Sequence, residues 1–136
     1  MTEPKCFIDT NLLVYFYSTD SKSAIVEGLI RANFDEICLS TQVLNELYCV
    51  LTRKKLKTKE EAQAIINDLI ENYKIYCLDE RGIKRGIELN IQYQLSYWDS
   101  LILASAIEAG CTKLYSEDLQ HNQVIQNGLT IINPFN

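Results

Sequence analysis

Four acidic residues stand where a carboxylate is unusual, and together they point to metal chemistry. Asp9 ends a short apolar run, Glu46 borders the apolar face of a predicted helix, Asp99 opens an almost wholly apolar segment, and Asp118 follows a further apolar run. Acidic side chains rarely lie on apolar faces unless they are paired, because burying an ionised carboxylate alone is costly. No Lys or Arg lies within three residues of any of the four. A divalent cation is therefore an economical partner, and hard carboxylate oxygens favour Mg²⁺ or Mn²⁺ over zinc.

Each acid taken alone has a simpler structural role. Asp9 can cap the helix that follows it, since Asp, Thr and Asn are preferred at that position. Asp99 fits a capping box, and Glu46 can be an ordinary flanking residue of an amphipathic helix. Asp118 can stabilise a turn, and its neighbour Glu117 is an alternative functional acid. Four independent roles would require four coincidences in one strand–helix context, which favours a shared site.

The elements that must position these acids alternate between strand and helix. Three of the acids fall at or just beyond the predicted strand ends or helix starts, and parallel strands present these points at one edge of a sheet. Such alternation is typical of a parallel sheet covered by helices. The apolar runs predict buried strands at 6–8, 37–39, 74–78, 113–115 and 129–132.

The helices between these strands show their own start and stop signals. One is expected from Ser40-Thr41 to about Arg53, and the most apolar one from Tyr97 to Ala109, with Gly110 ending it. Further expectations are a helix capped by Asp20-Ser21, a capping box of Thr58 with Glu61, a helix capped by Asp79, a short helix at 120–126 and a turn at Asn127-Gly128.

Composition fits a globular chain with its own core. With 136 residues, 47% of them hydrophobic, residues 1–136 are expected to form a single domain. No segment has the apolar length of a membrane span, and the first five residues lack a signal-peptide pattern, so we expect a cytoplasmic protein without membrane contact. The net charge of −5 argues against a polyanionic partner, but without the four acids only −1 is left.

Histidine and cysteine usage excludes the common zinc sites. His121 is the only histidine, and no two of the five cysteines form a Cys-x-x-Cys pair. With an odd number of widely spaced cysteines, mostly beside apolar runs, reduced thiols in the core are expected.

One segment is strongly basic and has two interpretations. Five cations occur within seven residues, namely Arg53, Lys54, Lys55, Lys57 and Lys59. They can form the solvated end of a helix, where cations suit the helix dipole. Alternatively, they can follow the phosphates of an RNA strand.

Five short motifs follow one another along the chain, namely Asp9-Thr10-Asn11, Asn45-Glu46, Tyr97-Trp98-Asp99, Ser116-Glu117-Asp118 and the ending Ile132-Asn133-Pro134-Phe135. Their order and spacing resemble those of PIN domains, and of the VapC-type toxin ribonucleases in particular. The resemblance covers the whole chain and implies a Rossmann-like fold, a three-layer α/β/α sandwich with a central, mostly parallel sheet.

The resemblance implies Mg²⁺- or Mn²⁺-dependent endoribonuclease activity, with an acidic quartet of Asp9, Glu46, Asp99 and Asp118. Asn11 and Ser116 would be polar supports. Metals suit this chemistry because they lower the pKa of bound water and hold phosphate oxygens. Asp9, Asp99 and Asp118 are assigned as metal ligands, whereas Glu46 is either a ligand or the group that orients the water. The subgroup further implies a cognate antitoxin protein and a homodimer.

Other functions compatible with parts of the pattern are a PIN nuclease of RNA processing outside toxin–antitoxin systems and an inactive PIN-like binding module. A phosphotransfer module also places an Asp after a parallel strand. However, a receiver domain needs an acidic pair there, and Asp9 has no acidic neighbour. The aspartate-nucleophile phosphatases need a second Asp two residues later, where Asn11 stands.

Overall fold

A mostly parallel sheet forms the centre of the computed structural model, which describes residues 5–126 and 128–136. Its strands lie in the order β3-β2-β1-β4-β6-β5. Each neighbouring pair is parallel except β5 and β6, which are antiparallel. The strands are β1 (Cys6–Ile8), β2 (Ile37–Ser40), β3 (Lys74–Tyr76), β4 (Lys113–Tyr115), β5 (Val124–Ile125) and β6 (Leu129–Ile132).

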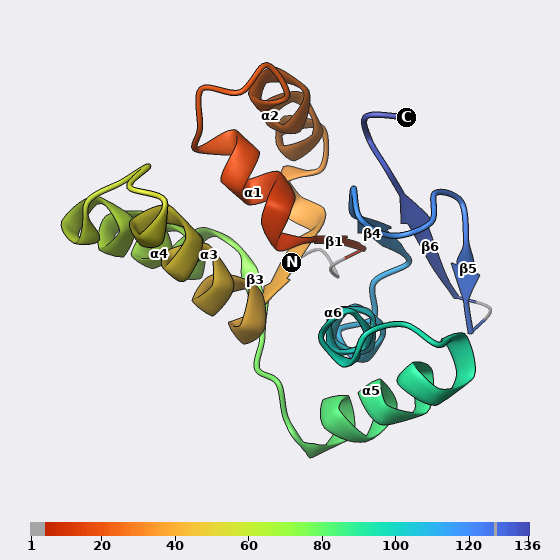
Figure 1. Cartoon of the computed structure of the whole chain (residues 1–136). Helices are drawn as coiled ribbons and strands as arrows, with labels where there is room; N and C mark the ends of the chain where they lie inside the picture. The colour runs from red at the N-terminus through yellow and green to blue at the C-terminus, as the bar shows by residue number, and fades with distance from the viewer. Residues whose placement is uncertain (1–4, 127) are drawn as a thin grey trace.

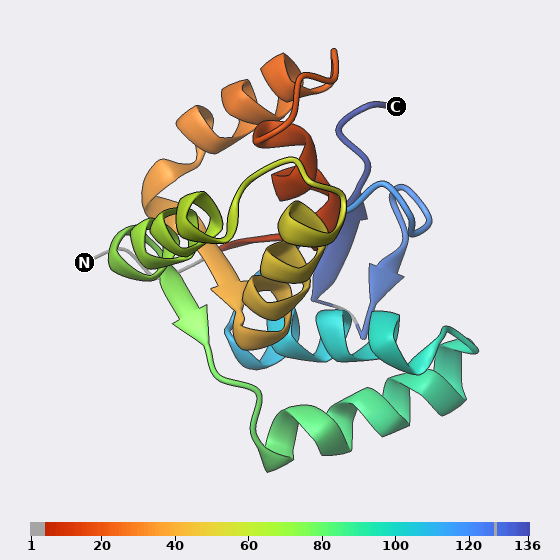
Figure 2. The same ribbon diagram turned by 60° about the vertical axis from the view of Figure 1, so that its left-hand side comes forward.

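Helices cover both faces of this sheet and give three layers. In Figure 1, α1 and α2 lie above the sheet, while α6 and α5 lie below it. Figure 2 shows α3 running in front of the sheet, with α4 beside it. The helices are α1 (Thr10–Phe16), α2 (Ser23–Ala32), α3 (Thr41–Arg53), α4 (Lys59–Asn72), α5 (Glu80–Tyr93) and α6 (Tyr97–Glu108), with a 3₁₀ turn at Phe34–Glu36. The predicted α/β/α fold class is confirmed.

The central strand β1 explains why its sequence is entirely apolar. Cys6, Phe7 and Ile8 are each at most 1% exposed. Phe7 pairs with Cys38 of β2 on one side and with Leu114 of β4 on the other. A strand that is covered on both faces has no solvent side, so a continuous apolar run replaces the usual alternation.

Helix α6 is the second buried element. Every residue from Ser100 to Ala106 is buried. The helix contacts β2 and β4 on one side and α5 on the other. Gly86 of α5 brings the two helices together, because a Cβ at this position would come within 2.8 Å of a methyl carbon of Leu101. The all-round apolar character of the segment therefore reflects burial between sheet and helix.

Most predicted boundaries are confirmed. Ser40 caps α3 through the backbone N–H of Val43, and Asp79 caps α5 through the N–H of Gly82. Thr58 and Glu61 form both bonds of the capping box at the start of α4. Gly110 follows α6 with a φ of 82°, a left-handed conformation that glycine adopts without strain.

Several local predictions were wrong. Instead of a helix at 120–126, Val124 and Ile125 form an edge strand paired with β6, because this pairing places Ile125 in the core. The predicted turn beyond it includes Asn127, which lies outside the described residues. The third strand ends at Tyr76, two residues early. Helix α2 begins at Ser23 without a side-chain cap, since Asp20 bonds the N–H of Lys22 in the preceding turn instead.

The cysteines are free thiols, as predicted, but not all lie in the core. Cys6, Cys38 and Cys111 are buried, whereas Cys49 and Cys77 are exposed. Over the described ranges, no helix combines the length and the hydropathy that crossing a bilayer requires.

Candidate active site

All four acids singled out in the sequence line one cavity of about 440 Å³, which we call the acidic cavity. Asp9 lies between β1 and α1, Glu46 in the second turn of α3, Asp99 in the first turn of α6, and Asp118 in the turn after β4. The carboxyl ends of β1 and β4 thus converge with two helices. A second cavity of about 470 Å³ lies between α3 and α4 and contains none of these acids. The chemistry therefore favours the acidic cavity as the site.

Asp9 is the most buried of the four acids and combines the two roles considered for it. Its Oδ1 accepts a hydrogen bond from the N–H of Thr10 at 2.7 Å, which caps α1. Its Oδ2 accepts one from the hydroxyl of Ser116 at 2.9 Å. Burial raises the pKa of Asp9 from 3.8 to about 6, against the lowering effect of these two bonds, and the charges of Glu46 and Asp118 add to the rise.

Glu46 is tied to the first turn of α1. The Thr10 hydroxyl donates to Oε1 of Glu46 at 2.7 Å, and the Gln42 amide lies 3.4 Å from its Oε2. Glu46 is therefore oriented from outside its own helix, which an ordinary flanking residue is not. Sequence reasoning overlooked this role of Thr10, and its position between Asp9 and Asn11 was the available signal.

The carboxylate of Asp99 is not used in capping. The hydroxyl of Ser96 accepts a hydrogen bond from the backbone N–H of Asp99 at 3.1 Å, so Ser96 caps α6. Among the described residues, the Asp99 side chain does not return a bond to the Ser96 backbone. Its half-buried carboxylate instead faces the acidic cavity.

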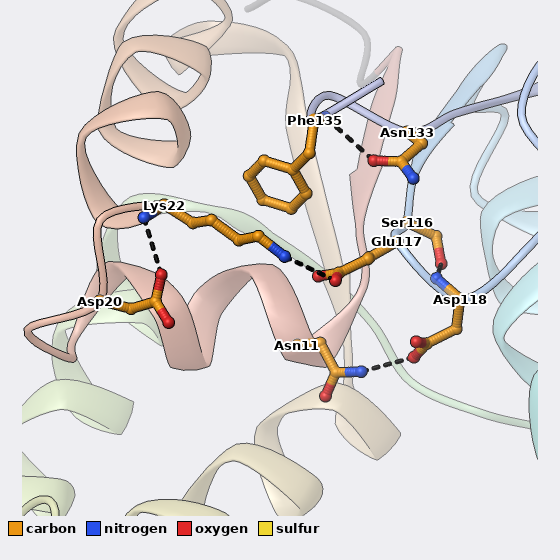
Figure 3. A network of polar contacts seen from close by, with 8 residues as sticks. All are labelled: Asn11, Asp20, Lys22, Ser116, Glu117, Asp118, Asn133 and Phe135. Atoms are coloured by element: carbon orange, nitrogen blue, oxygen red, sulfur yellow. Dashed lines mark hydrogen bonds and ion pairs between the residues drawn. The ribbon is translucent and has the colours of Figure 1, made fainter.

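Asp118 is positioned by the two residues that were expected to be polar supports. The amide of Asn11 donates to Oδ2 of Asp118, and the Ser116 hydroxyl accepts a bond from the Asp118 N–H at 3.3 Å (Figure 3). Because Ser116 also donates to Asp9, one hydroxyl joins the β1 and β4 sides of the cavity.

Glu117, the alternative acid, points the other way. Its carboxylate forms an ion pair of 2.8 Å with Lys22 (Figure 3), and this ammonium group lowers the pKa of Glu117. The Lys22 ammonium also lies 5.0 Å from the ring centre of Tyr15 and 4.8 Å from that of Phe135. These contacts join the start of α2, the turn after β4 and the C-terminal segment. Glu117 is thus occupied by Lys22, and Asp118 is the acid of this turn that lines the acidic cavity.

The acids share a cavity without forming a compact ligand cluster. Within residues 5–126 and 128–136, no three acidic, histidine or cysteine side chains are arranged so that they could hold a metal ion as they stand. Thr10 donates a hydrogen bond to Glu46, and Asn11 donates one to Asp118. Each carboxylate thus has its own hydrogen-bond donor, as expected for acids that repel one another when no cation lies between them. The four carboxylates, of which Asp9 is buried, match the oxygen ligands of Mg²⁺ or Mn²⁺ in their chemistry.

The basic segment reaches the cavity at one residue. Arg53, at the end of α3, lines the acidic cavity. Lys54, Lys55 and Lys57 lie in the connection to α4, and Lys59 begins that helix and lines the cavity between α3 and α4. The cluster therefore extends from the rim of the acidic cavity over the α3–α4 turn.

Comparison with solved structures shows the same fold in bacterial toxins at low sequence identity. The Mycobacterium tuberculosis toxin VapC20, described as cleaving the sarcin–ricin loop, has 17% identity and a TM-score of 0.71 over 84% of this chain and 90% of its own. A toxin–antitoxin complex from Klebsiella pneumoniae has 16% identity and a TM-score of 0.75, covering 96% and 98%. DNA-bound VapBC from Salmonella typhimurium has 18% identity and a TM-score of 0.71, covering 94% and 96%.

Sequence comparison places the chain in a family. No curated protein sequence matches it significantly. The model of the PIN domain, however, matches residues 6–125, a range that contains β1 to β5 and all four acids of the cavity. With this match over most of its length, the chain belongs to the PIN domain family.

Proposed function

We propose that this protein is a divalent-metal-dependent endoribonuclease and the toxin of a toxin–antitoxin pair. The observation that carries the proposal is the convergence of four carboxylates, from four separate segments, on one cavity of a PIN fold. The likeness in fold to VapC20 and to VapBC complexes supports the toxin assignment.

In this proposal Asp9, Asp99 and Asp118 hold the cation. When bound, Mg²⁺ or Mn²⁺ lowers the pKa of a bound water and offsets the negative charge of the phosphate. The Ser116 hydroxyl and the Thr10 N–H donate to the two oxygens of Asp9 and keep both in place, and the Asn11 amide donates to Oδ2 of Asp118. These hydrogen bonds limit the conformations of the two carboxylates, which lowers the entropic cost of ordering them around a cation.

We assign Glu46 to the orientation of the attacking water. The Thr10 hydroxyl holds Oε1 of Glu46 at 2.7 Å, whereas Oε2 has only a long contact of 3.4 Å with Gln42. Oε2 can therefore accept a hydrogen bond from water within the cavity. Arg53, on the same face of α3, is placed to bond a phosphate oxygen of the RNA.

The test is cleavage of single-stranded RNA by the purified protein in Mn²⁺, Mg²⁺, Ca²⁺ or EDTA. Cleavage is expected with Mn²⁺ and Mg²⁺ only, because the loose coordination of Ca²⁺ activates water poorly. Glu46→Gln should bind Mn²⁺ and lose turnover by about 100-fold or more, as removal of a general base does. Cleavage that survives exhaustive EDTA treatment would disprove the metal-dependent mechanism, and absence of cleavage under all conditions would favour an inactive PIN-like module.

The proposed partners are the RNA substrate, an antitoxin protein and a second copy of this chain. The Klebsiella and Salmonella structures are toxin–antitoxin assemblies, which supports the antitoxin. Expression with and without the neighbouring open reading frame tests this assignment. Growth arrest by the chain alone, relieved by that neighbour, is the expected result, and harmless expression of an RNA-cleaving protein would favour an RNA-processing role.

The basic segment yields a separate prediction on RNA affinity. Replacing Lys54, Lys55 and Lys57 by Gln should weaken binding equally for all RNA sequences and flatten the dependence of log K on log salt by up to about two, because each lost phosphate contact lowers the slope by about 0.7 for single strands. Filter binding from 50 to 300 mM KCl measures the slope. Gln substitution of Lys5, Lys74 and Lys113, three exposed cations at the amino ends of β1, β3 and β4, is the matched control. An unchanged slope would show that the segment is only the solvated end of a helix and does not contact the RNA.

A further inference from the structure

The tryptophan beside Asp99 is the most unusual aromatic side chain in the molecule. Trp98 is the only tryptophan of the chain, and 65% of it is exposed. It lines the acidic cavity, and its ring meets that of Tyr97 edge to face, with 5.6 Å between the ring centres. Large aromatic residues bury most of their surface on folding. An exposed indole beside a cluster of acids is therefore a candidate contact surface for a ligand.

The backbone of Trp98 is fixed relative to α3. The amide of Gln42 donates to the Trp98 carbonyl oxygen at 3.3 Å and also contacts Glu46. The indole is therefore presented by the first turn of a buried helix that is bonded to its neighbour. The indole ring itself is restrained by its edge-to-face contact with Tyr97, which reduces the freedom that it loses when a flat ligand covers it.

The acidic cavity extends along one face of α3. The face of α3 that lines it runs from Gln42, bonded to Trp98, to Arg53 at the other end. These residues are eleven positions apart, which is roughly 16 Å of helix. Glu46 lies between them, and Asp99 of α6 lines the same cavity. A strand crossing the cavity would thus meet an aromatic ring, then the acids, then a guanidinium group.

We propose that Trp98 is a stacking platform for an unpaired nucleobase of the RNA, adjacent to the phosphate that is cleaved. This inference rests on the proposed nuclease function and specifies its substrate as single-stranded. An indole stacks on the face of any base, whereas bases within an RNA duplex are already stacked and paired. Arg53 at the far end supplies the phosphate contact that an exposed surface for an apolar protein partner would not need.

The single tryptophan makes the test direct. In EDTA, with Asp9→Asn present to prevent cleavage, titration with single-stranded oligoadenylate and oligouridylate should quench the Trp98 fluorescence. A duplex of equal length should bind without quenching. Quenching that is equal for duplex and single strand would show a phosphate contact only and overturn the proposal.

Affinity and turnover give a second readout. Trp98→Ala should weaken single-strand binding by about tenfold or more, the scale of one lost base stack, and Trp98→Phe should retain part of it. In Mn²⁺, Trp98→Ala should raise KM for RNA more than it lowers kcat. Phe34→Ala is the matched control, since this exposed ring lies in the 3₁₀ turn before β2, away from the acidic cavity.

The possible outcomes separate this inference from the nuclease assignment. If the parent protein cleaves RNA but Trp98→Ala leaves binding and KM unchanged, the stacking site is wrong and the nuclease stands. If no cleavage occurs but single strands quench Trp98, the protein binds RNA without cutting it. Unchanged RNA affinity, together with loss of antitoxin binding in Trp98→Ala, would assign the indole to a protein interface instead.

Discussion

Asp99→Asn is expected to abolish RNA cleavage and to remove most of the stabilisation that metal gives the parent protein. Without metal, the carboxylates around the cavity repel one another, so removing one charge while keeping the shape should raise the melting temperature in EDTA. The cap of α6 should persist, because it uses the backbone N–H of Asp99 and the hydroxyl of Ser96.

In excess Mn²⁺ the order of stability should be reversed. A ligand that binds only the folded state stabilises it by about 2.7 kcal/mol at 100 times its dissociation constant, which is roughly 10 °C for a chain of this size. The parent should show this rise, and Asp99→Asn should show little of it. Asp35→Asn, an exposed acid in the 3₁₀ turn, is the control and should respond like the parent.

Thermal melts of the three proteins in EDTA and in Mn²⁺ measure the crossover. A variant that is less stable than the parent in EDTA but keeps its full Mn²⁺ response would show that Asp99 supports the helix start and not a metal. The assignment of the acidic cavity as a metal site would then lose one of its three ligands.

Asp9→Asn is expected to remove a specific pH dependence of the metal-free protein. Burial raises the pKa of Asp9 from 3.8 to about 6 in the folded state. The folded protein therefore binds the proton more tightly than the unfolded chain does. The stabilisation from this group is fully present below pH 3.8 and is lost as the pH rises through 6. A rise of about two pKa units corresponds to about 3 kcal/mol at most.

The difference between variant and parent isolates this effect from other titrating groups. Below pH 4 the two proteins should have similar free energies of unfolding, because Asp9 is then protonated and resembles asparagine. Above pH 6.5 the variant should be more stable by up to about 3 kcal/mol. Its amide can donate to Ser116 while its carbonyl accepts from Thr10, so both hydrogen bonds of the site are kept.

Urea unfolding in EDTA at intervals between pH 4 and 7.5 measures this difference, and Asp35→Asn again serves as the control. A difference that stays constant over this range would show that Asp9 is ionised throughout in the folded protein. Binding of Mn²⁺ should be lost in Asp9→Asn, and its retention would place the metal elsewhere.

The sequence by itself determined the elements whose causes are local. The apolar run of β1 required a strand covered on both faces, and helix caps such as Ser40 and Asp79 required only backbone groups within three residues. The positions of Asp9, Asp99 and Asp118 at strand ends or helix starts followed from the same patterns. Because parallel strands end at one edge, the shared cavity was predictable without any long-range contact.

Tertiary structure alone decided the contacts between distant segments. The apolar pattern of residues 124–125 is too short to distinguish a helix from a strand. These residues form a strand because they pair with β6. Asp118 and Glu117 are equivalent in sequence, but Lys22, 95 residues away, binds Glu117. Thr10 and Glu46 meet across 36 residues, and Trp98 meets the α3 face across 56. Sequence periodicity describes only near neighbours along the chain, so these choices depended on how helices and strands pack together.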